Sequence, residues 1–220
     1  MALSTIQLMH LADSALPVGG FAFSNGLEAA VKSGMVASQA DLSSYLKTAL
    51  RQWTAFDIPF LNSLYADGPP ELLQRYDLMM LSPSMRKGSI AQGRGWLRIF
   101  RELFPNHSTD RIKAQFKDAG VPLHWMPLMV LTLKSVGATL AQVRELFMFV
   151  QLRDQLSAAV RLGLLGPSRA QRLQSELESS MDGELQLASE KTAEEAVRIA
   201  PGLDMAQMLQ PSLYSKLFQN

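Results

Sequence analysis

Near its N-terminus the chain reads DSALPVGGFAFSNGLE, residues 13–28, a stretch called the connector below. Pro17 fixes its own φ angle and pushes the preceding residue toward an extended conformation. Gly19 and Gly20 admit φ angles that are closed to other residues, or a close approach of another backbone. The connector is therefore predicted to be a rigid, shaped link between two helices.

Helical patterns lie on both sides of the connector. Ser24 is a candidate N-cap for a helix from residue 25 to 32, which Gly34 ends. Alternating strand patterns and Asn-Gly or Asp-Gly hairpin turns are missing, so we expect an all-α fold of roughly ten helices in a single domain, residues 1–220. The predicted helices are 4–12, 25–32, 38–65, 71–81, 82–104, 106–117, 122–137, 139–162, 168–180 and 182–199, followed by a short amphipathic turn at 203–209.

The predicted helix 82–104 contains Gly88, Gly93 and Gly95. Each glycine weakens a helix by roughly 1 kcal/mol relative to alanine. One explanation is a broken helix or a loop. We favour close packing, with a neighbouring helix against the glycine face, because Trp96 and Phe100 keep helical spacing.

The composition restricts the class of protein. Hydrophobic residues make up 47% of the 220 residues, charged residues only 19%, and the formal net charge is +1. The balanced charge gives no basic stripe for a nucleic acid, and no apolar run is long enough to span a membrane. The first residues lack the basic region and cleavage site of a signal peptide, so we expect a cytoplasmic protein.

Groups that could carry catalysis are sparse. There is no cysteine, and the three histidines do not have metal-ligand spacing. No phosphate-binding loop or nucleophile elbow is present. We therefore expect a protein that is not an enzyme and holds no cofactor or metal. The alternative is a helical hydrolase or lyase with a histidine–carboxylate pair, such as His10 with Asp13 or Glu28.

The C-terminal part, from about residue 203, contains Met205 and Met208 and ends with two large apolar anchors, Tyr214 and Phe218. Methionine adapts to irregular surfaces, and exposed apolar side chains at a terminus favour partner binding. We expect this part to dock to a partner. The alternative is that it folds back on its own domain.

Four blocks of the chain resemble the urease accessory protein F family. The first is the connector, with the order Asp-Ser-x-Leu-Pro-x-Gly-Gly-Phe-x-x-Ser-x-Gly-Leu-Glu. The third is the run from Leu152 to Pro167, and the fourth is Tyr-Ser-Lys-Leu-Phe at 214–218. The second block consists of Lys87, Ser89, Gln92, Gly93 and Arg98.

This resemblance implies a non-catalytic, all-helical chaperone for nickel insertion into apo-urease. Members form homodimers, bind a second accessory protein called D or H, and with it recruit the accessory GTPase. Nickel would be handled by the complex rather than held by this chain, although a nickel carrier in its own right is a further alternative. Asp154 and Arg161 are expected to orient the long late helix. The residues expected to bind partners are Pro17, Gly19, Gly20, Ser24, Gly26, Leu27, Glu28, Lys87, Gln92, Arg161, Tyr214, Lys216 and Phe218.

Three positions depart from the family pattern. Lys216 stands where members have arginine, and lysine keeps the charge but loses the bidentate fork. Gln210-Pro211 replaces a His-Glu pair, so the tail is not expected to supply a nickel ligand. Near Phe23 many members place a histidine or tyrosine, and that polar contact is absent here.

Overall fold

The computed structural model describes residues 3–219, and within this range it contains ten α-helices and no strand. The predicted all-α class is confirmed. The helices are α1 Thr5–Leu11, α2 Leu27–Lys32, α3 Gln39–Tyr65, α4 Glu71–Leu78, α5 Pro83–Leu103, α6 Asp110–Asp118, α7 Trp125–Ser135, α8 Leu140–Arg161, α9 Pro167–Leu187 and α10 Pro201–Leu209. Short 3-10 turns lie at η1 Gly20–Ala22, η2 Ala193–Glu195 and η3 Gln210–Ser212.

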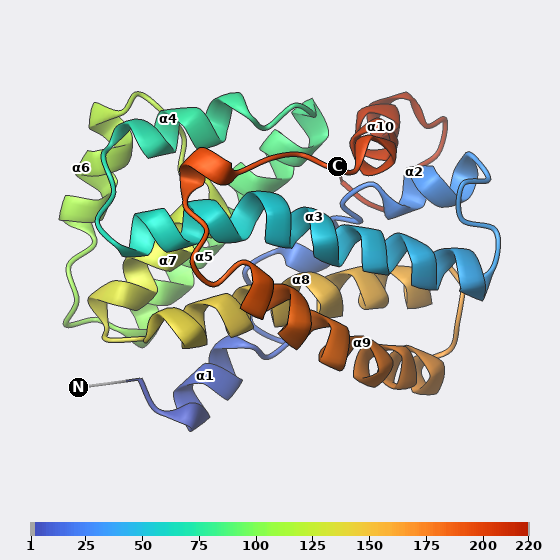
Figure 1. Ribbon diagram of the computed structural model, residues 1–220, viewed down its shortest axis with the longest axis horizontal. Coiled ribbons are helices and arrows are strands. Elements are labelled where there is room, and N and C mark those ends of the chain that lie inside the picture. Colours follow the sequence, from blue (N-terminus) through green and yellow to red (C-terminus); the bar gives the residue numbers. More distant parts are fainter. Residues whose placement is uncertain (1–2, 220) are drawn as a thin grey trace.

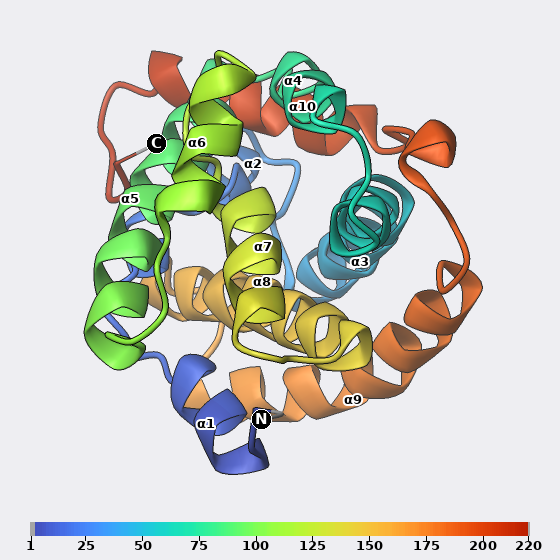
Figure 2. The same cartoon turned by 90° about the vertical axis from the view of Figure 1, so that its left-hand side faces the viewer.

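Helix α3 has 27 residues and runs along the long axis of the molecule (Figure 1). Its N-cap is Ser38, whose hydroxyl accepts a hydrogen bond from the Asp41 amide at 3.1 Å. The helix continues through Pro59 to Tyr65, as the sequence predicts. Helices α7, α8 and α9 pack against it. In Figure 2 it is seen nearly end-on, with other helices around it.

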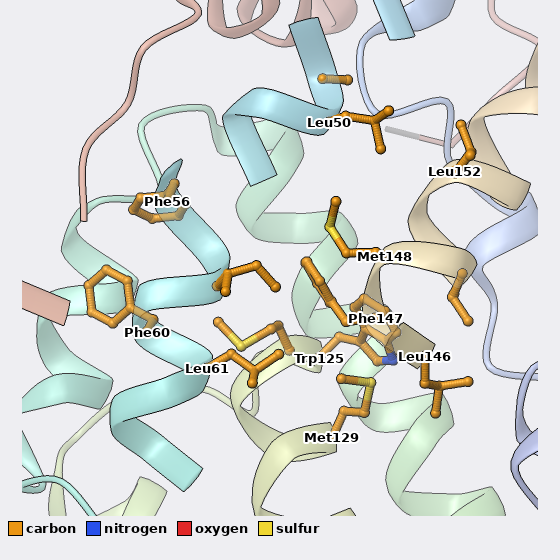
Figure 3. Packing of buried hydrophobic residues seen from close by; sticks show 14 of the residues in the cluster. Leu50, Phe56, Phe60, Leu61, Trp125, Met129, Leu146, Phe147, Met148 and Leu152 are labelled. Atoms are coloured by element: carbon orange, nitrogen blue, oxygen red, sulfur yellow. The ribbon is translucent and has the colours of Figure 1, made fainter. Parts of the chain in front are cut away.

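Large apolar side chains from α3, α7 and α8 meet in the core (Figure 3). Trp125 of α7 stacks on Phe147 of α8 with 5.7 Å between ring centroids. The apolar segment around α7 is buried, and none of the described helices is both long and apolar enough to cross a bilayer. Residues 13–22 of the connector have no fully buried member, so they lie outside this core.

The glycine face of α5 packs closely against its neighbours, which confirms the prediction from its spacing. A Cβ atom at Gly93 would overlap the carbonyl oxygen of Leu123, just before α7. A Cβ atom at Gly95 would overlap the carbonyl oxygen of Val18 in the connector. The glycines therefore let α5 approach both α7 and the connector at backbone distance.

The helix after the connector begins later than predicted. Asn25 and Gly26 both have positive φ angles, 48° and 92°, which a right-handed helix does not allow. The helix therefore begins at Leu27, with Gly26 as N-cap, and the expected capping role of Ser24 is wrong. Its predicted end is confirmed, because Gly34 has a φ angle of 80°.

The predicted helices 168–180 and 182–199 are also wrong in part. Helix α9 begins at Pro167, after Gly166 rather than Ser168, and continues without a break to Leu187. Residues 188–200 are irregular apart from the turn η2.

Side chains of α3 explain why this alanine- and glutamate-rich segment is not helical. The Asn62 amide donates to the carbonyl oxygens of Ala188 and Lys191, at 3.0 and 2.7 Å. The Gln52 carbonyl oxygen accepts the amides of residues 199 and 200, both at 2.8 Å. These tertiary hydrogen bonds satisfy the backbone in an extended path, and they outweigh a weak helical preference.

Candidate partner-binding surface

The carboxylate of Glu28, on α2, holds the end of the chain. Its side chain is completely buried and accepts the backbone amides of Leu217 at 2.7 Å and Phe218 at 3.3 Å. The Gln210 side chain donates to the same carboxylate at 2.8 Å. Residues 213–219, called the tail below, therefore fold back onto the connector and lie against α2, in the part of the molecule where Figure 1 labels α2.

Lys32 completes the environment of this carboxylate. Its ammonium group lies 2.9 Å from Glu28, one helical turn away, and also donates to the carbonyl oxygen of Ser215. Burial alone would raise the pKa of Glu28, but the hydrogen bonds from Lys32, the two tail amides and Gln210 outweigh it and lower the pKa. Glu28 is therefore ionised at neutral pH and attracts both Lys32 and the tail.

Arg161, at the C-terminal end of α8, fastens the connector to the tail from the other side. Its guanidinium carbon lies 3.8 Å from the ring centroid of Phe21 and 4.2 Å from that of Phe218. The same side chain donates to the Phe21 carbonyl oxygen. The Gln219 amide donates to the carbonyl oxygen of Ala22 at 2.8 Å. Connector, α8 and tail thus form one continuous surface.

The connector itself has a fixed backbone path. Gly19 has a φ angle of 97°, a conformation that favours glycine. A Cβ atom at Gly20 would overlap the carboxylate of Asp154, so a larger residue here would displace that side chain. The Arg98 guanidinium donates to the carbonyl oxygen of Pro17 at 3.2 Å. The predicted rigidity of the connector therefore rests on contacts with both α5 and α8.

The thirteen residues expected to bind partners fall into two groups by exposure. Those that are buried shape the surface from beneath and cannot touch a partner in this conformation: Ser24, Gly26, Leu27, Glu28, Gln92 and Phe218. Those that are exposed or half-buried are Pro17, Gly19, Gly20, Lys87, Arg161, Tyr214 and Lys216. Partner binding by these residues remains a prediction.

Folding back of the tail leaves apolar side chains on its outer side. Phe218 is buried, but Tyr214 is fully exposed and Leu217 is half-exposed. Lys216 is exposed and makes no hydrogen bond or ion pair with any described residue. On the neighbouring helix α10, the exposed apolar side chains are Met205, Met208 and Leu209. One of the two predicted apolar anchors is therefore used inside the molecule, and the other faces outward.

Lys87 and Gln92 lie on α5 and make no hydrogen bond to Glu28 or the tail. Lys87 is exposed on the molecular surface, whereas Gln92 is buried and lines a cavity. The structure therefore does not join these two residues to the connector and tail by direct bonds.

The histidine–carboxylate pair expected for a hydrolase or lyase is not formed. The exposed His10 side chain hydrogen-bonds to neither Asp13 nor Glu28, and Glu28 is occupied by the tail. A different pair exists instead. His124 Nε2 lies 2.7 Å from Asp77 and its Nδ1 lies 3.1 Å from the Ser89 hydroxyl. These residues are far apart in the sequence, so no local pattern could have indicated their contact.

The Ser89–His124–Asp77 set is fully used in joining α4, α5 and the start of α7. Ser89 also accepts the Trp125 amide at 3.2 Å, and Asp77 pairs with Arg86 at 2.8 Å. The imidazole is buried, and burial lowers its pKa more than Asp77 raises it, so the ring is neutral at pH 7. In this conformation one ring nitrogen contacts Asp77 and the other contacts Ser89.

Within residues 3–219, no group of three or more histidine, aspartate and glutamate side chains is placed to hold a metal ion.

Comparison with known proteins gives the family. The family model for UreF matches residues 36–178 of this chain. The chain belongs to the UreF family. The urease accessory protein F of Oryza sativa subsp. indica is 33% identical over 217 residues, which cover 95% of this chain and 82% of that protein. The protein of the same name from Arabidopsis thaliana is 32% identical, with 95% of this chain and 90% of the relative covered.

A bacterial relative is less similar in sequence, but the match covers more of both chains. The urease accessory protein UreF of Paenarthrobacter aurescens strain TC1 is 23% identical over 98% of this chain and 97% of its own. The match to the family model ends before the tail and begins after the connector. Both segments of the connector–tail surface therefore lie outside the range that the family model matches.

Proposed function

We propose that this UreF family member is a urease accessory protein that acts as a non-catalytic scaffold during nickel insertion into apo-urease. The observation that carries the proposal is the connector–tail surface. Two segments almost 200 residues apart converge on Glu28 and present Tyr214 and Leu217 outward. The buried carboxylate holds the tail in one position while apolar side chains of the tail stay exposed. Such an arrangement is suited to presenting the tail to another protein.

The proposed partners are the D- or H-type urease accessory protein, the accessory GTPase and apo-urease. The low charged fraction, 19%, agrees with a protein that covers part of its surface with partners. We propose that the scaffold works as a cytoplasmic homodimer. Nickel is cargo of the assembled complex in this proposal, and this chain supplies positioning rather than ligands.

The experiment that tests the scaffold role is size exclusion with light scattering. The purified chain is measured alone, then with the D-type accessory protein, then with the nucleotide-loaded GTPase added. The scaffold proposal expects a dimer that shifts to a discrete larger complex at each addition. A chain that elutes unchanged with both partners would contradict it.

A second measurement separates scaffolding from nickel carriage. Isothermal titration of the isolated chain with Ni²⁺ is expected to show no tight, stoichiometric site. Tight binding by the isolated chain would favour the nickel-carrier alternative. Apo-urease mixed with nickel, GTP and the remaining accessory proteins is then assayed for urease activity, which should depend on this chain.

A further inference from the structure

A polar cavity of about 70 Å³ lies where α3, α5, α8 and α10 approach one another. Polar side chains from every one of these helices reach its wall, although its surroundings are the apolar core. Among them are Gln52 and Asp57 of α3, Gln92 of α5, Gln155 of α8 and Gln207 of α10. So many polar groups around one space require an explanation.

The wall contains most of the unpaired buried polar atoms of the described chain. Seven such side-chain atoms occur within residues 3–219, and five of them belong to residues that line this cavity. Three are donors and two are acceptors: Gln52 Nε2, Trp125 Nε1, Arg198 Nη1, Gln155 Oε1 and Gln207 Oε1. Because the five residues line one space, a single explanation for their unpaired atoms is sought there.

Leaving all five atoms without partners would cancel much of the free energy that keeps a domain folded. Paired with a bound molecule, each would recover its hydrogen bond. A buried water needs about 10–15 Å³ of such space and two to four polar partners. The cavity therefore has room for several water molecules, and its wall supplies their partners.

The charges around the cavity favour a neutral occupant. Arg198 is already paired with Asp204, so its positive charge is balanced. Asp57 adds a carboxyl group that accepts a hydrogen bond from Tyr76 at 2.9 Å. Three unpaired donors beside two unpaired acceptors suit a molecule that both donates and accepts, rather than an anion or a cation.

We propose that this cavity is a buried hydration site, in which a cluster of ordered waters joins α10 and the segment before it to α3 and α8. Direct hydrogen bonds already link the same elements. Gln52 accepts two amides of that segment, and Gln207 donates to the carbonyl oxygen of Asn25 at 3.4 Å. The waters complete the hydrogen bonds that these two glutamines leave open, and so they help to position α10 beside the connector.

A high-resolution crystal structure of the full chain tests the proposal directly. We expect ordered water peaks within hydrogen-bonding distance of Gln52 Nε2, Gln155 Oε1 and Gln207 Oε1. An empty cavity would overturn the proposal, as would side chains rotated so that they pair with one another. Density for a larger neutral solute would overturn the assignment to water.

Variants test the same site in solution. Gln155→Leu removes one acceptor from the wall, and Gln115→Leu is the matched control, because Gln115 also has an unpaired buried oxygen but does not line this cavity. Oxygen-17 relaxation dispersion counts long-lived buried waters. The count should fall for Gln155→Leu and stay unchanged for Gln115→Leu.

Equal counts for wild type and Gln155→Leu would contradict the proposal. If Gln155→Leu fails to fold, as judged by circular dichroism, Gln207→Leu on the surface-proximal helix α10 takes its place with the same expected loss. A loss of long-lived water in Gln115→Leu as large as that in the cavity variants would also count against a specific site.

Discussion

At the scale of single residues, Asp57 is an acid whose pKa is strongly raised. It is almost completely buried on α3, and burial raises its pKa to about 7, against the hydrogen bond from Tyr76 and the charge of Arg198. In the unfolded chain the same group has a pKa of 3.8. The folded protein thus binds more protons than the unfolded chain between these two values, and Asp57 lowers stability progressively as the pH rises from about 4 to about 7.

Asp57→Asn is expected to remove this pH dependence. The amide oxygen can still accept from Tyr76, but the group no longer ionises. One pKa unit corresponds to about 1.4 kcal/mol, so the variant should gain a few kcal/mol over wild type at pH 8 and little at pH 4.5. Urea unfolding of both proteins across this range measures the difference in their free energies of unfolding. The contributions of other titrating groups cancel in this difference. Asp118→Asn, at an exposed position of α6, is the control. A difference that does not change with pH would contradict the assignment.

Glu28 makes the opposite kind of contribution. Its lowered pKa means that it stabilises the fold above its unfolded pKa of 4.5, and this contribution is lost as the pH falls through the lower folded value. Glu28→Gln turns one acceptor oxygen into a donor that faces other donors. We expect a loss of about 1–3 kcal/mol and faster amide exchange at Leu217 and Phe218. Glu102→Gln, at an exposed position of α5, is the control. Unchanged tail exchange in Glu28→Gln would show that the carboxylate does not hold the tail.

At the scale of elements, the glycines of α5 allow a paired test. Gly93→Ala places a Cβ atom on a backbone oxygen, which cannot move aside as a side chain would. We expect it to destabilise the protein by about 1–3 kcal/mol. Gly183→Ala in α9 meets no atom within 4 Å and should stabilise by about 0.5–1 kcal/mol. Chemical denaturation gives both values. If Gly93→Ala stabilised the protein as much as Gly183→Ala, the argument for close packing of α5 on α7 would be wrong.

The sequence predicts an element well when the partners of its hydrogen bonds lie nearby in the chain, and poorly when they lie on a distant helix. The capping boxes at Ser4 and Thr139 close within three residues, and both were predictable from local sequence. The glycine spacing in α5 also indicated close packing correctly. The segment 188–200 was predicted as helix, because its alanines and glutamates favour one, but its partners are Gln52 and Asn62 on a distant helix.

The candidate surface shows the same limit more strongly. The sequence marked the connector and the tail separately, but nothing local indicated that Glu28 binds amides 189 and 190 residues away. Gln210 was notable only as a departure from the family pattern. In the structure it is completely buried and donates to Glu28, so the departure has a structural role in this chain.

At the scale of the whole molecule, connector, α10 and tail are held to the helical body by polar bonds and also by apolar contacts, since Leu27, Leu203 and Phe218 belong to the core. Glu28 and Arg161 hold the tail, and Gln52 holds the backbone before α10. Large side chains of α3, α7 and α8 fill the centre of the apolar core (Figure 3), and the tail contributes only Phe218 to it. Removal of the tail should therefore leave that core intact.

A chain ending at Pro211 is expected to stay helical, with a midpoint of thermal unfolding lower by several degrees, because Phe218 is no longer buried. It should no longer form the complex with the D-type accessory protein in light scattering. The truncation removes both the tail's shape and its exposed side chains, so a full-length variant is needed to separate them. Tyr214→Ala with Leu217→Ala keeps the hydrogen bonds of the tail to Glu28, because these use backbone amides.

If the exposed side chains contact the partner, the double variant should bind at least tenfold more weakly while its thermal midpoint stays near that of wild type. Ile6→Ala is the control, since Ile6 is as exposed and apolar but lies on α1, away from the tail in both views (Figures 1 and 2). Full binding by the double variant together with none by the truncated chain would mean that the partner recognises the tail's backbone or Lys216 instead. Full binding by both would exclude the tail as a partner surface, because no exposed part of it would then be required.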